Sequence, residues 1–228
     1  MKAIVSLSGG MDSATVLAAA LEEGRAAECV GFRYGSKHNP YENAAAAAVA
    51  AHYGAPYRLL DLSGVMAGFR SDLLAAGGPV PEGHYEAESM RRTVVPGRNT
   101  IFAAVLLGLA QSEGAGEVWL GVHAGDHHIY PDCRPEWVDR MGAVMSAASE
   151  GAVTCRAPFL HQTKEGILRY GQARAVPYRL TRTCYKDQPV ACGRCGSCQE
   201  RLAAFAALGA EDPLPYEARD LLPKGEGR

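Results

Sequence analysis

The stretch Ser8-Gly9-Gly10-Met11-Asp12-Ser13 stands between a short apolar run and a segment of helical character, near the start of a 228-residue chain. Glycines let the backbone turn tightly, and the helix that follows offers free N–H groups and its positive dipole end to an anion. The hydroxyls of Ser8 and Ser13 can donate to phosphate oxygens, and Asp12 can bind Mg²⁺ or cap the helix. The pattern has neither the Lys-Ser/Thr pair of the Walker loop nor the G-x-G-x-x-G of dinucleotide-binding folds. It therefore predicts a phosphate-binding loop of another kind.

Strand-like and helical segments alternate along the rest of the chain. Apolar runs of strand length are separated by helical stretches of roughly 10–15 residues, which is typical of βαβ units. The sequence therefore predicts an α/β fold with a Rossmann-like open, mostly parallel sheet and helices on both faces. Strands are expected at Lys2–Leu7, Cys29–Tyr34, Tyr57–Leu62, Glu117–Val122 and Pro177–Leu180. Helices are expected at Asp12–Glu23, Tyr41–Tyr53, Thr100–Ser112, Pro135–Ser149, Thr163–Ala173 and Cys198–Leu208.

Two parts of the chain depart from this alternation. Ser63 to Pro96 carries the breakers Gly77-Gly78-Pro79 and Pro81, so we expect a long irregular segment that is either mobile or a lid. From Cys184 onward, cysteine and glycine replace the apolar periodicity. We therefore expect a main α/β domain over residues 1–182 and a small metal-held segment over residues 183–228.

Four of the seven cysteines gather near the C-terminus in a C-x7-C-x2-C-x2-C pattern. Four thiolates at this spacing can close one tetrahedral site, and Gly193 and Gly196 supply the turns that aim the sulfurs inward. A closed four-thiolate zinc site is structural, since it leaves no coordination position for water. An iron–sulfur cluster is the alternative, although here the fourth ligand lies upstream and no Cys-Pro follows. The expected zinc ligands are Cys184, Cys192, Cys195 and Cys198.

Composition and charge limit the function classes. With 47% hydrophobic and 21% charged residues, the chain can bury a sizeable core, which excludes a wholly disordered protein. No run approaches ~18 uninterrupted apolar residues, so no membrane-spanning helix is expected. A formal net charge of −2 argues against a protein that coats nucleic acid through bulk charge. Seven cysteines without a secretory-type start indicate reduced thiols and a cytoplasmic location.

One segment is nevertheless basic. Residues 164–201 carry eight Lys and Arg against three acids, a local balance of +5. A charge run of this kind is usually a solvated face, but it also suits a polyanion such as ATP or RNA. Both interpretations stay open at this point.

Three further segments hold candidate ligand-binding side chains. In Val95-Pro96-Gly97-Arg98-Asn99, Arg98 offers a forked donor that suits phosphate or carboxylate, whereas Asn99 also suits a helix cap. Gly121 to Asp126 follows an expected strand, where ligands collect in open α/β sheets. The third segment, Tyr130-Pro131-Asp132-Cys133-Arg134, comes shortly after.

The loop at Ser8–Ser13 resembles the PP-loop of the ATP pyrophosphatase superfamily. Taken together, the motifs resemble one family over essentially the whole chain, the 7-cyano-7-deazaguanine synthase (QueC) family of the queuosine pathway. The resemblance is carried by the PP-loop, Tyr34-Gly35-Ser36-Lys37-His38, Val95 to Asn99, Tyr130 to Arg134, Thr163-Lys164, Cys184-Tyr185, the cysteine cluster, and Asp212-Pro213 with Tyr216. Residues 1–182 would then form a PP-loop ATP-binding domain.

The resemblance implies an ATP-dependent carbon–nitrogen ligase. It would convert 7-carboxy-7-deazaguanine and ammonia to 7-cyano-7-deazaguanine through adenylated carboxylate and amide intermediates. ATP and Mg²⁺ would bind at Leu7, Ser8, Gly9, Gly10, Met11, Asp12 and Ser13. Asp12, Lys164 and Arg98 would be catalytic, with the two cations neutralising charge on the phosphates. Asn99, Asp126 and Asp132 would contact the deazaguanine.

Other features of the family interpretation concern partners and alternatives. We expect small-molecule substrates, no membrane, no direct nucleic-acid partner and a homodimer. Cys133 is interpreted as a packing residue. One alternative is a PP-loop enzyme that thiolates tRNA, for which Cys133 or Cys155 would be the reactive thiol. The other is a zinc-ribbon-like RNA-binding module that uses the basic segment, although it leaves the phosphate loop unexplained.

Overall fold

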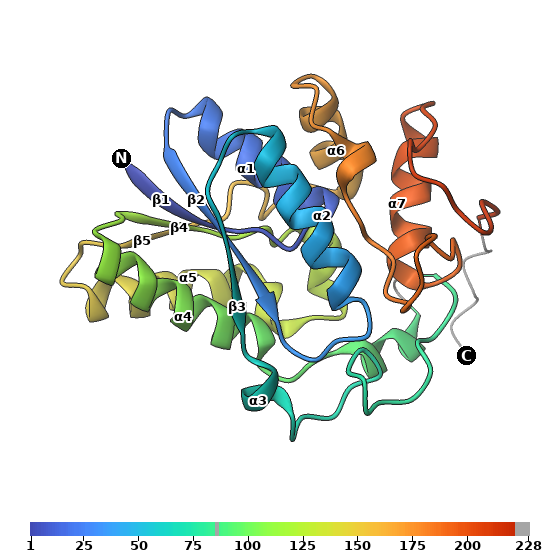
Figure 1. The fold of residues 1–228 in the computed structure, drawn as a ribbon, viewed down its shortest axis with the longest axis horizontal. Coiled ribbons are helices and arrows are strands. Elements are labelled where there is room, and N and C mark those ends of the chain that lie inside the picture. The colour runs from blue at the N-terminus through green and yellow to red at the C-terminus, as the bar shows by residue number, and fades with distance from the viewer. Residues whose placement is uncertain (85–86, 222–228) are drawn as a thin grey trace.

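A parallel sheet forms the centre of the fold (Figure 1). The computed structural model describes residues 1–84 and 87–221, and within them five strands pair in the order β3-β2-β1-β4-β5. Every pair is parallel. The strands are β1 (Lys2–Ser6), β2 (Ala26–Arg33), β3 (Tyr57–Asp61), β4 (Glu117–Trp119) and β5 (Thr154–Arg156). The predicted open parallel sheet is therefore confirmed.

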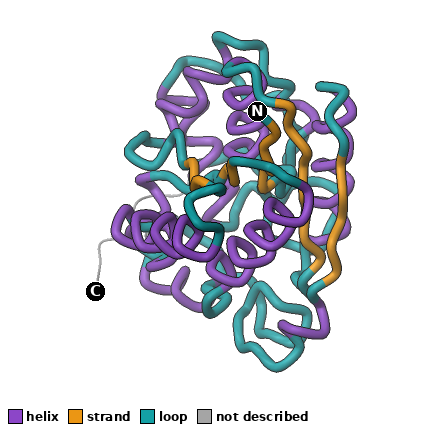
Figure 2. The backbone as a smooth tube through the Cα atoms, turned by 90° about the vertical axis from the view of Figure 1, so that its left-hand side faces the viewer, coloured by secondary structure: helices purple, strands orange, loops and turns teal. Residues whose placement is uncertain are grey.

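Helices cover both faces of this sheet (Figure 1), and Figure 2 shows the same arrangement after a quarter turn. One face carries α1 (Met11–Glu22), α2 (Asn39–His52) and α6 (Lys164–Gln172), and the other carries α4 (Arg98–Glu113) and α5 (Pro135–Ala148). Each strand of a sheet buried on both sides must be apolar on both faces. In β1, Ala3 and Val5 accordingly pack with α1, whereas Ile4 packs with α4.

The smaller elements lie in the connections. They are α3 (Ser63–Met66) and 3-10 helices at Glu88–Thr93, Ala124–His128, Pro131–Cys133 and Tyr178–Leu180. The expected irregular segment from Ser63 to Pro96 is largely irregular, and two of these short elements interrupt it. Near its end, Glu82 forms an isolated bridge with Cys195 and an ion pair with Lys186, so this segment contacts the cysteine-rich part of the chain.

One expected strand is wrong, and one observed strand was not predicted. The predicted strand at Pro177–Leu180 is a 3-10 helix. Proline has no N–H for a strand ladder, and the Tyr178 hydroxyl instead lies 2.9 Å from that of Thr15, which holds the turn against α1. The actual fifth strand, β5, has only three residues and lies at the sheet edge beside β4. Its side chains are polar or half-buried, so it has no periodic signal that a sequence pattern could detect.

One helical stretch among the described residues, Glu88–Glu113, has the length and hydropathy of a membrane span. It is not one continuous helix, because Gly97 has a φ of +63° and separates the 3-10 helix Glu88–Thr93 from α4. Leu106 and Ala110 of α4 are fully buried in the cluster that packs on the sheet. The stretch therefore has the packing of a core helix in an α/β fold.

The C-terminal segment contains α7 (Gly196–Ala207), which packs beside α6 (Figure 1). Ala204 and Phe205 of α7 belong to the same buried cluster as α1 and α6. Arg201 is fully buried and forms a bidentate ion pair with Asp212 at 2.6 and 2.9 Å. These contacts join the cysteine-rich segment tightly to the α/β part, while the division at residue 182 stays a prediction.

Candidate active site and metal centre

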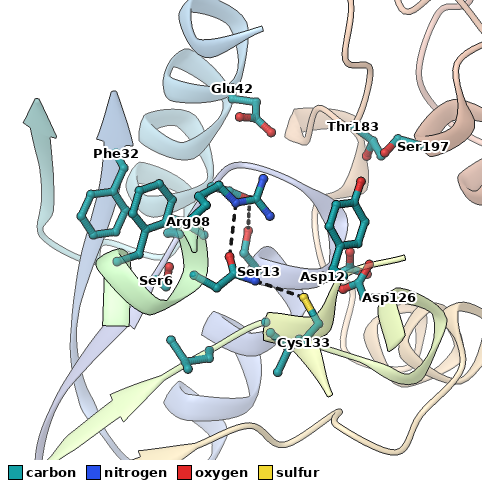
Figure 3. A pocket seen from close by; sticks show the side chains of 18 of the residues that line it. Ser6, Asp12, Ser13, Phe32, Glu42, Arg98, Asp126, Cys133, Thr183 and Ser197 are labelled. Atoms are coloured by element: carbon teal, nitrogen blue, oxygen red, sulfur yellow. Dashed lines mark hydrogen bonds between the residues drawn. The ribbon is translucent and has the colours of Figure 1, made fainter. Parts of the chain in front are cut away.

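A pocket lies at the carboxyl ends of the parallel strands (Figure 3) and encloses about 190 Å³. Its walls begin where β1, β2 and β4 end, and β1 and β4 are the strands at which the chain order of the sheet reverses. Open α/β sheets bind ligands at such a switch point. The strand ends contribute Ser6, Leu7, Ser8, Phe32, Tyr34, Leu120, Gly121 and Val122 to the lining.

The predicted phosphate loop forms one wall of this pocket. Gly9 has a φ of +89°, and a Cβ at this position would lie 2.4 Å from the carbonyl oxygen of Glu42 in α2. Only glycine fits this close approach of loop and helix. The Ser8 hydroxyl accepts the N–H of Gly10 at 3.2 Å and lies 3.1 Å from the hydroxyl of Ser13. These contacts fix the conformation of the loop next to the cavity without a bound ligand.

The residues of the loop do not all face the cavity. Leu7, Ser8, Asp12 and Ser13 line it. Met11, predicted to bind the nucleotide, is the first residue of α1, and its side chain is fully buried in the core. Asp12 lies in the first turn of α1, where acidic side chains are favoured by the helix dipole.

A buried lysine meets the loop from the start of α6. Thr163 caps this helix by accepting the N–H of Gly166, and Lys164 follows directly. Nζ of Lys164 donates to Oδ2 of Asp12 at 2.7 Å and lies 3.0 Å from Oε2 of Glu200. Burial alone lowers the pKa of this lysine, but the carboxylates around it outweigh burial and raise it. Lys164 therefore carries its charge inside the pocket.

The groups around Lys164 form a connected network. Burial alone raises the pKa of Asp12, but nearby positive charge, above all that of Lys164, outweighs burial and lowers it, so Asp12 stays ionised. Nε2 of His123 lies 3.0 Å from Nζ of Lys164 and 3.4 Å from the carboxylate of Asp126. Burial raises the pKa of Glu200. Lys164 is thus held among acidic groups. A polyphosphate could replace these carboxylates as the partner of the ammonium group, while the metal ion of the polyphosphate binds the carboxylates.

The start of α4 brings Arg98 and Asn99 to the opposite wall. The Asn99 side chain donates to the carbonyl oxygen of Asp132 and to Sγ of Cys133, both at 3.1 Å. Its own Oδ1 accepts Nε of Arg98 at 3.3 Å. The carboxylate of Asp132 accepts the backbone N–H of Asn99 at 3.0 Å, and Asp132 is half-buried and outside the pocket lining. Asp132 thus pairs with a backbone N–H in the first turn of α4, and its contact with a deazaguanine stays a prediction.

Aromatic rings surround this second wall. Phe32 and Phe102 stack with their ring centres 4.0 Å apart, and Tyr34 packs edge-on to Phe102 at 5.4 Å. The guanidinium of Arg98 lies 6.0 Å from the ring centre of Tyr130. The aromatic lining comprises Phe32, Tyr34, Phe102, Tyr130, Trp137 and Tyr185. A flat, largely apolar ligand fits these surroundings.

The four predicted metal ligands come together in the C-terminal segment. The sulfur atoms of Cys184, Cys192, Cys195 and Cys198 all lie within 4.8 Å of one another, and all four residues are buried. Those of Cys192 and Cys198 are 4.0 Å apart, close to the roughly 3.8 Å edge of a tetrahedron with 2.3 Å metal–sulfur bonds. Backbone N–H groups of Arg194 and Cys195 donate to Sγ of Cys192, which stabilises a thiolate. The donor set fits one metal ion.

Comparison with known proteins identifies the family. A model described as "Queuosine biosynthesis protein QueC" matches residues 2–209. A protein from Marinomonas sp. named 7-cyano-7-deazaguanine synthase is 44% identical over 95% of this chain and 99% of its own length. Another of that name, from Alteromonas mediterranea, is 45% identical over 94% of this chain and 98% of its own length. The chain belongs to the QueC family. The membership predicted from the motifs is confirmed, and with it the expectation of an enzyme.

A solved structure shares the fold of this QueC family member. The U34-tRNA thiolase NcsA from Methanococcus maripaludis, determined with its [4Fe-4S] cluster, aligns with a TM-score of 0.50. The alignment covers 91% of this chain and 65% of that one, at 15% sequence identity. At this identity the likeness concerns the fold alone, and it agrees with the expected PP-loop type of α/β architecture.

Two polar groups of the network around Lys164 were missed as site residues by sequence reasoning. His123 lies in the quoted segment after β4, but a lone histidine carries no pattern that separates a buried network residue from a surface one. Glu200 follows the last cysteine by two positions, and nothing in the sequence predicts that α7 turns this carboxylate toward Lys164. Of the predicted residues, the pocket brings together Asp12, Lys164, Arg98, Asn99 and Asp126.

Proposed function

We propose that the chain is an ATP-dependent ligase that converts 7-carboxy-7-deazaguanine and ammonia to 7-cyano-7-deazaguanine. The observation that carries this proposal is its 44–45% identity, over almost the full length, to proteins that carry the name of that synthase. The pocket supports it because a phosphate loop with a buried lysine meets a wall suited to a flat heterocycle.

The loop wall is the proposed ATP site. The N–H groups of the Gly9-Gly10 turn and the hydroxyls of Ser8 and Ser13 would hold the phosphates, with the dipole of α1 adding to them. Asp12 is the proposed Mg²⁺ ligand, since its Oδ1 is buried and has no hydrogen-bond partner among the described residues. When bound, Mg²⁺ would offset phosphate charge. Lys164 would stabilise the negative charge that develops on the leaving pyrophosphate.

The reaction needs two activations of the same carbon. One carboxylate oxygen attacks the α-phosphorus of ATP and pyrophosphate leaves, which turns a poor leaving group into AMP. Ammonia then displaces AMP and a proton is lost, giving the amide. In the second cycle the amide oxygen attacks the α-phosphorus of another ATP and pyrophosphate leaves. Loss of AMP and of both protons from the nitrogen then leaves the nitrile. The pocket residues contribute positioning and charge compensation to these steps.

The aromatic wall is the proposed deazaguanine site. Asp126 lines the pocket, and its carboxylate is suited to accept N–H groups of the base. Asn99 holds this wall together, because its backbone N–H and its side-chain amide join α4 to the loop at Asp132 and Cys133. We therefore propose that Asp132 positions this wall.

The cysteine site is proposed to hold one zinc ion with a structural role. Its four buried sulfurs leave no open coordination position, and their spacing suits a single ion. In an iron–sulfur cluster the four thiolates are divided between two or four irons, so they cannot all lie as close to one another as these sulfurs do.

The alternative to the proposed ligase is an enzyme that thiolates tRNA. It needs a reactive thiolate near ATP, whereas burial raises the pKa of Cys133 well above its usual value and that of Cys155 to about 11. Both thiols are therefore protonated at neutral pH. The homodimer, the lack of a nucleic-acid partner and the cytoplasmic location stay predictions.

Mass spectrometry tests the proposed reaction directly. The protein is mixed with Mg-ATP, an ammonium salt and 7-carboxy-7-deazaguanine, and the amide and nitrile are followed over time. Nitrile that forms only when all three substrates are present supports the proposal. No turnover by metal-loaded protein that still binds ATP would contradict it, and Cys133→Ser and Cys155→Ser variants would then test the thiolating alternative.

A further inference from the structure

Two cations line the pocket, and their surroundings differ. Lys164 is paired with Asp12 and Glu200, so its charge is compensated within the protein. Arg98 forms no ion pair with any carboxylate in residues 1–84 and 87–221. Its Nε donates to Oδ1 of Asn99, a contact that orients the guanidinium without neutralising it. In Figure 3 the guanidinium of Arg98 points into the open part of the pocket.

The ionisable neighbours of Arg98 carry no charge. They are the phenols of Tyr34, Tyr130 and Tyr185 and the thiol of Cys133. Burial raises the pKa of each of these four groups, so all stay protonated at neutral pH. Arg98 is half-buried, and a guanidinium that is partly removed from water without a counter-charge is costly. Its fork of N–H donors is therefore available for an anion that arrives with a ligand.

The shape of the same wall limits what that anion is attached to. Phe32, Phe102 and Tyr34 form a stacked and edge-on aromatic group beside Arg98. The phosphate-binding groups, in contrast, lie at the loop wall with Asp12 and Lys164. The ligand that satisfies both the rings and the guanidinium is a flat aromatic ring that bears a carboxylate.

We propose that Arg98 recognises the carboxylate of the acid substrate and does not bind ATP phosphate. This inference rests on the proposed function, because it concerns the acid substrate of that reaction. The guanidinium holds one carboxylate oxygen while the other attacks the α-phosphorus and pyrophosphate leaves. After ammonia displaces AMP, the amide is neutral and Arg98 has no charge to bind. Arg98 therefore serves the first half of the reaction and not the second.

The test compares Arg98→Met with the wild-type protein on two substrates, 7-carboxy-7-deazaguanine and the corresponding amide, each with saturating Mg-ATP. Losing charge-assisted hydrogen bonds should raise KM for the acid by roughly tenfold to a hundredfold. KM for the amide should change by less than about threefold, since no charged contact is lost. Arg98→Lys keeps the positive charge but lacks the forked pair of N–H donors, so its KM for the acid should lie between those of the wild type and Arg98→Met. Calorimetric binding of acid and amide without ATP should show the same difference.

Arg91→Met is the matched control, because Arg91 is exposed and pairs with Glu88 outside the pocket. It should leave both KM values unchanged. Equal losses on acid and amide, or a rise in KM for ATP as large as that for the acid, would overturn the inference and assign Arg98 to the nucleotide. If Arg98→Met does not fold, Arg98→Lys provides the test, again by comparing the change in KM for the acid with the change in KM for the amide. A wild-type protein that converts neither compound contradicts the proposed reaction, and its calorimetric preference for acid over amide still tests Arg98.

Discussion

Lys164 joins three parts of the chain that are far apart in sequence, because it contacts Asp12 of α1, His123 after β4 and Glu200 of α7. Removing its charge leaves two carboxylates facing each other with no cation between them. A motif comparison could predict Asp12 and Lys164 because each lies in a recognisable sequence context. Their mutual contact could not be predicted, since it depends on α1 and α6 packing side by side.

We expect Lys164→Met to lose activity through the ATP side of the pocket. The repulsion between Asp12 and Glu200 and the missing cation should raise KM for ATP and lower kcat/KM by roughly a hundredfold to a thousandfold. Steady-state kinetics with varied ATP measures this. Lys2→Met, which removes a lysine paired with Glu113 at the surface, should leave both parameters unchanged. Unchanged kinetics in the Lys164 variant would remove this residue from the proposed mechanism.

Glu113 gives a prediction of pH dependence. Lys2 donates to it at 2.6 Å and Arg58 lies at 2.6 Å, and these contacts lower the pKa of its carboxyl from 4.5 to about 2. A folded-state pKa below the unfolded value stabilises the protein above pH 4.5, and the stabilisation is lost as the pH falls toward 2. Glu113→Gln should therefore be less stable than the wild type at pH 7, with a difference that shrinks on acidification. Urea unfolding across this range measures it, and a difference that does not change with pH would show that the loss is one of packing.

At the scale of elements, the phosphate loop and α2 are built against each other. A methyl group at Gly9 would collide with the backbone of α2, at 2.4 Å from the Glu42 oxygen and 2.6 Å from the Ala46 nitrogen. Gly9→Ala should therefore displace the loop and weaken ATP binding as well as lower stability. Gly24→Ala is the matched control, because Gly24 also has a positive φ of +72° but no heavy atom within 4 Å of an added Cβ. Calorimetry with an ATP analogue should separate the two, and equal effects would mean that φ alone is responsible.

The metal centre and the pocket share a helix. Cys195 precedes α7, Cys198 lies in its first turn, and Glu200, two residues further along the same helix, pairs with Lys164. Cys195→Ser should lower the bound zinc and the thermal stability together, because site closure contributes to folding free energy. It should also raise KM for ATP as α7 loosens. Metal analysis and unfolding curves measure the first two effects, and one full equivalent of zinc in the variant would show that the ligand set is wrong.

At the scale of the whole molecule, the basic segment is less basic than its sequence indicates. Of its eight cations, Lys164, Arg182 and Arg201 are buried, and Lys186 pairs with Glu82. Four arginines of the segment stay exposed, and one of them, Arg174, pairs with Glu22, so the part of the +5 balance that a polyanion such as RNA can reach is reduced. We expect filter binding with bulk tRNA to show only weak retention that disappears with modest salt. A tight complex at physiological ionic strength would favour the RNA-binding alternative.

The same scale shows where sequence reasoning stops. The alternation of apolar strands and helices predicted the parallel sheet and its covering helices because each segment has its own periodicity. It missed β5, whose three residues obtain their strand geometry from β4, and it mistook Pro177–Leu180, whose geometry comes from contact with α1. In the pocket, Glu200 was missed for a related reason, since its burial is a property of helix packing and not of its neighbours in sequence.

The pocket is lined by residues from Ser6 to Glu200, so its first and last walls come from opposite ends of the chain. A chain that emerges from the ribosome in order can form the β1–α1 loop early, but it has no counterpart for Lys164 from α7 until residues 196–207 have been made. The assembly of the complete proposed nucleotide site thus has to wait for the synthesis of α7. Truncated chains that have lost α7 would leave the lysine paired with Asp12 alone, and ATP would meet an incomplete site.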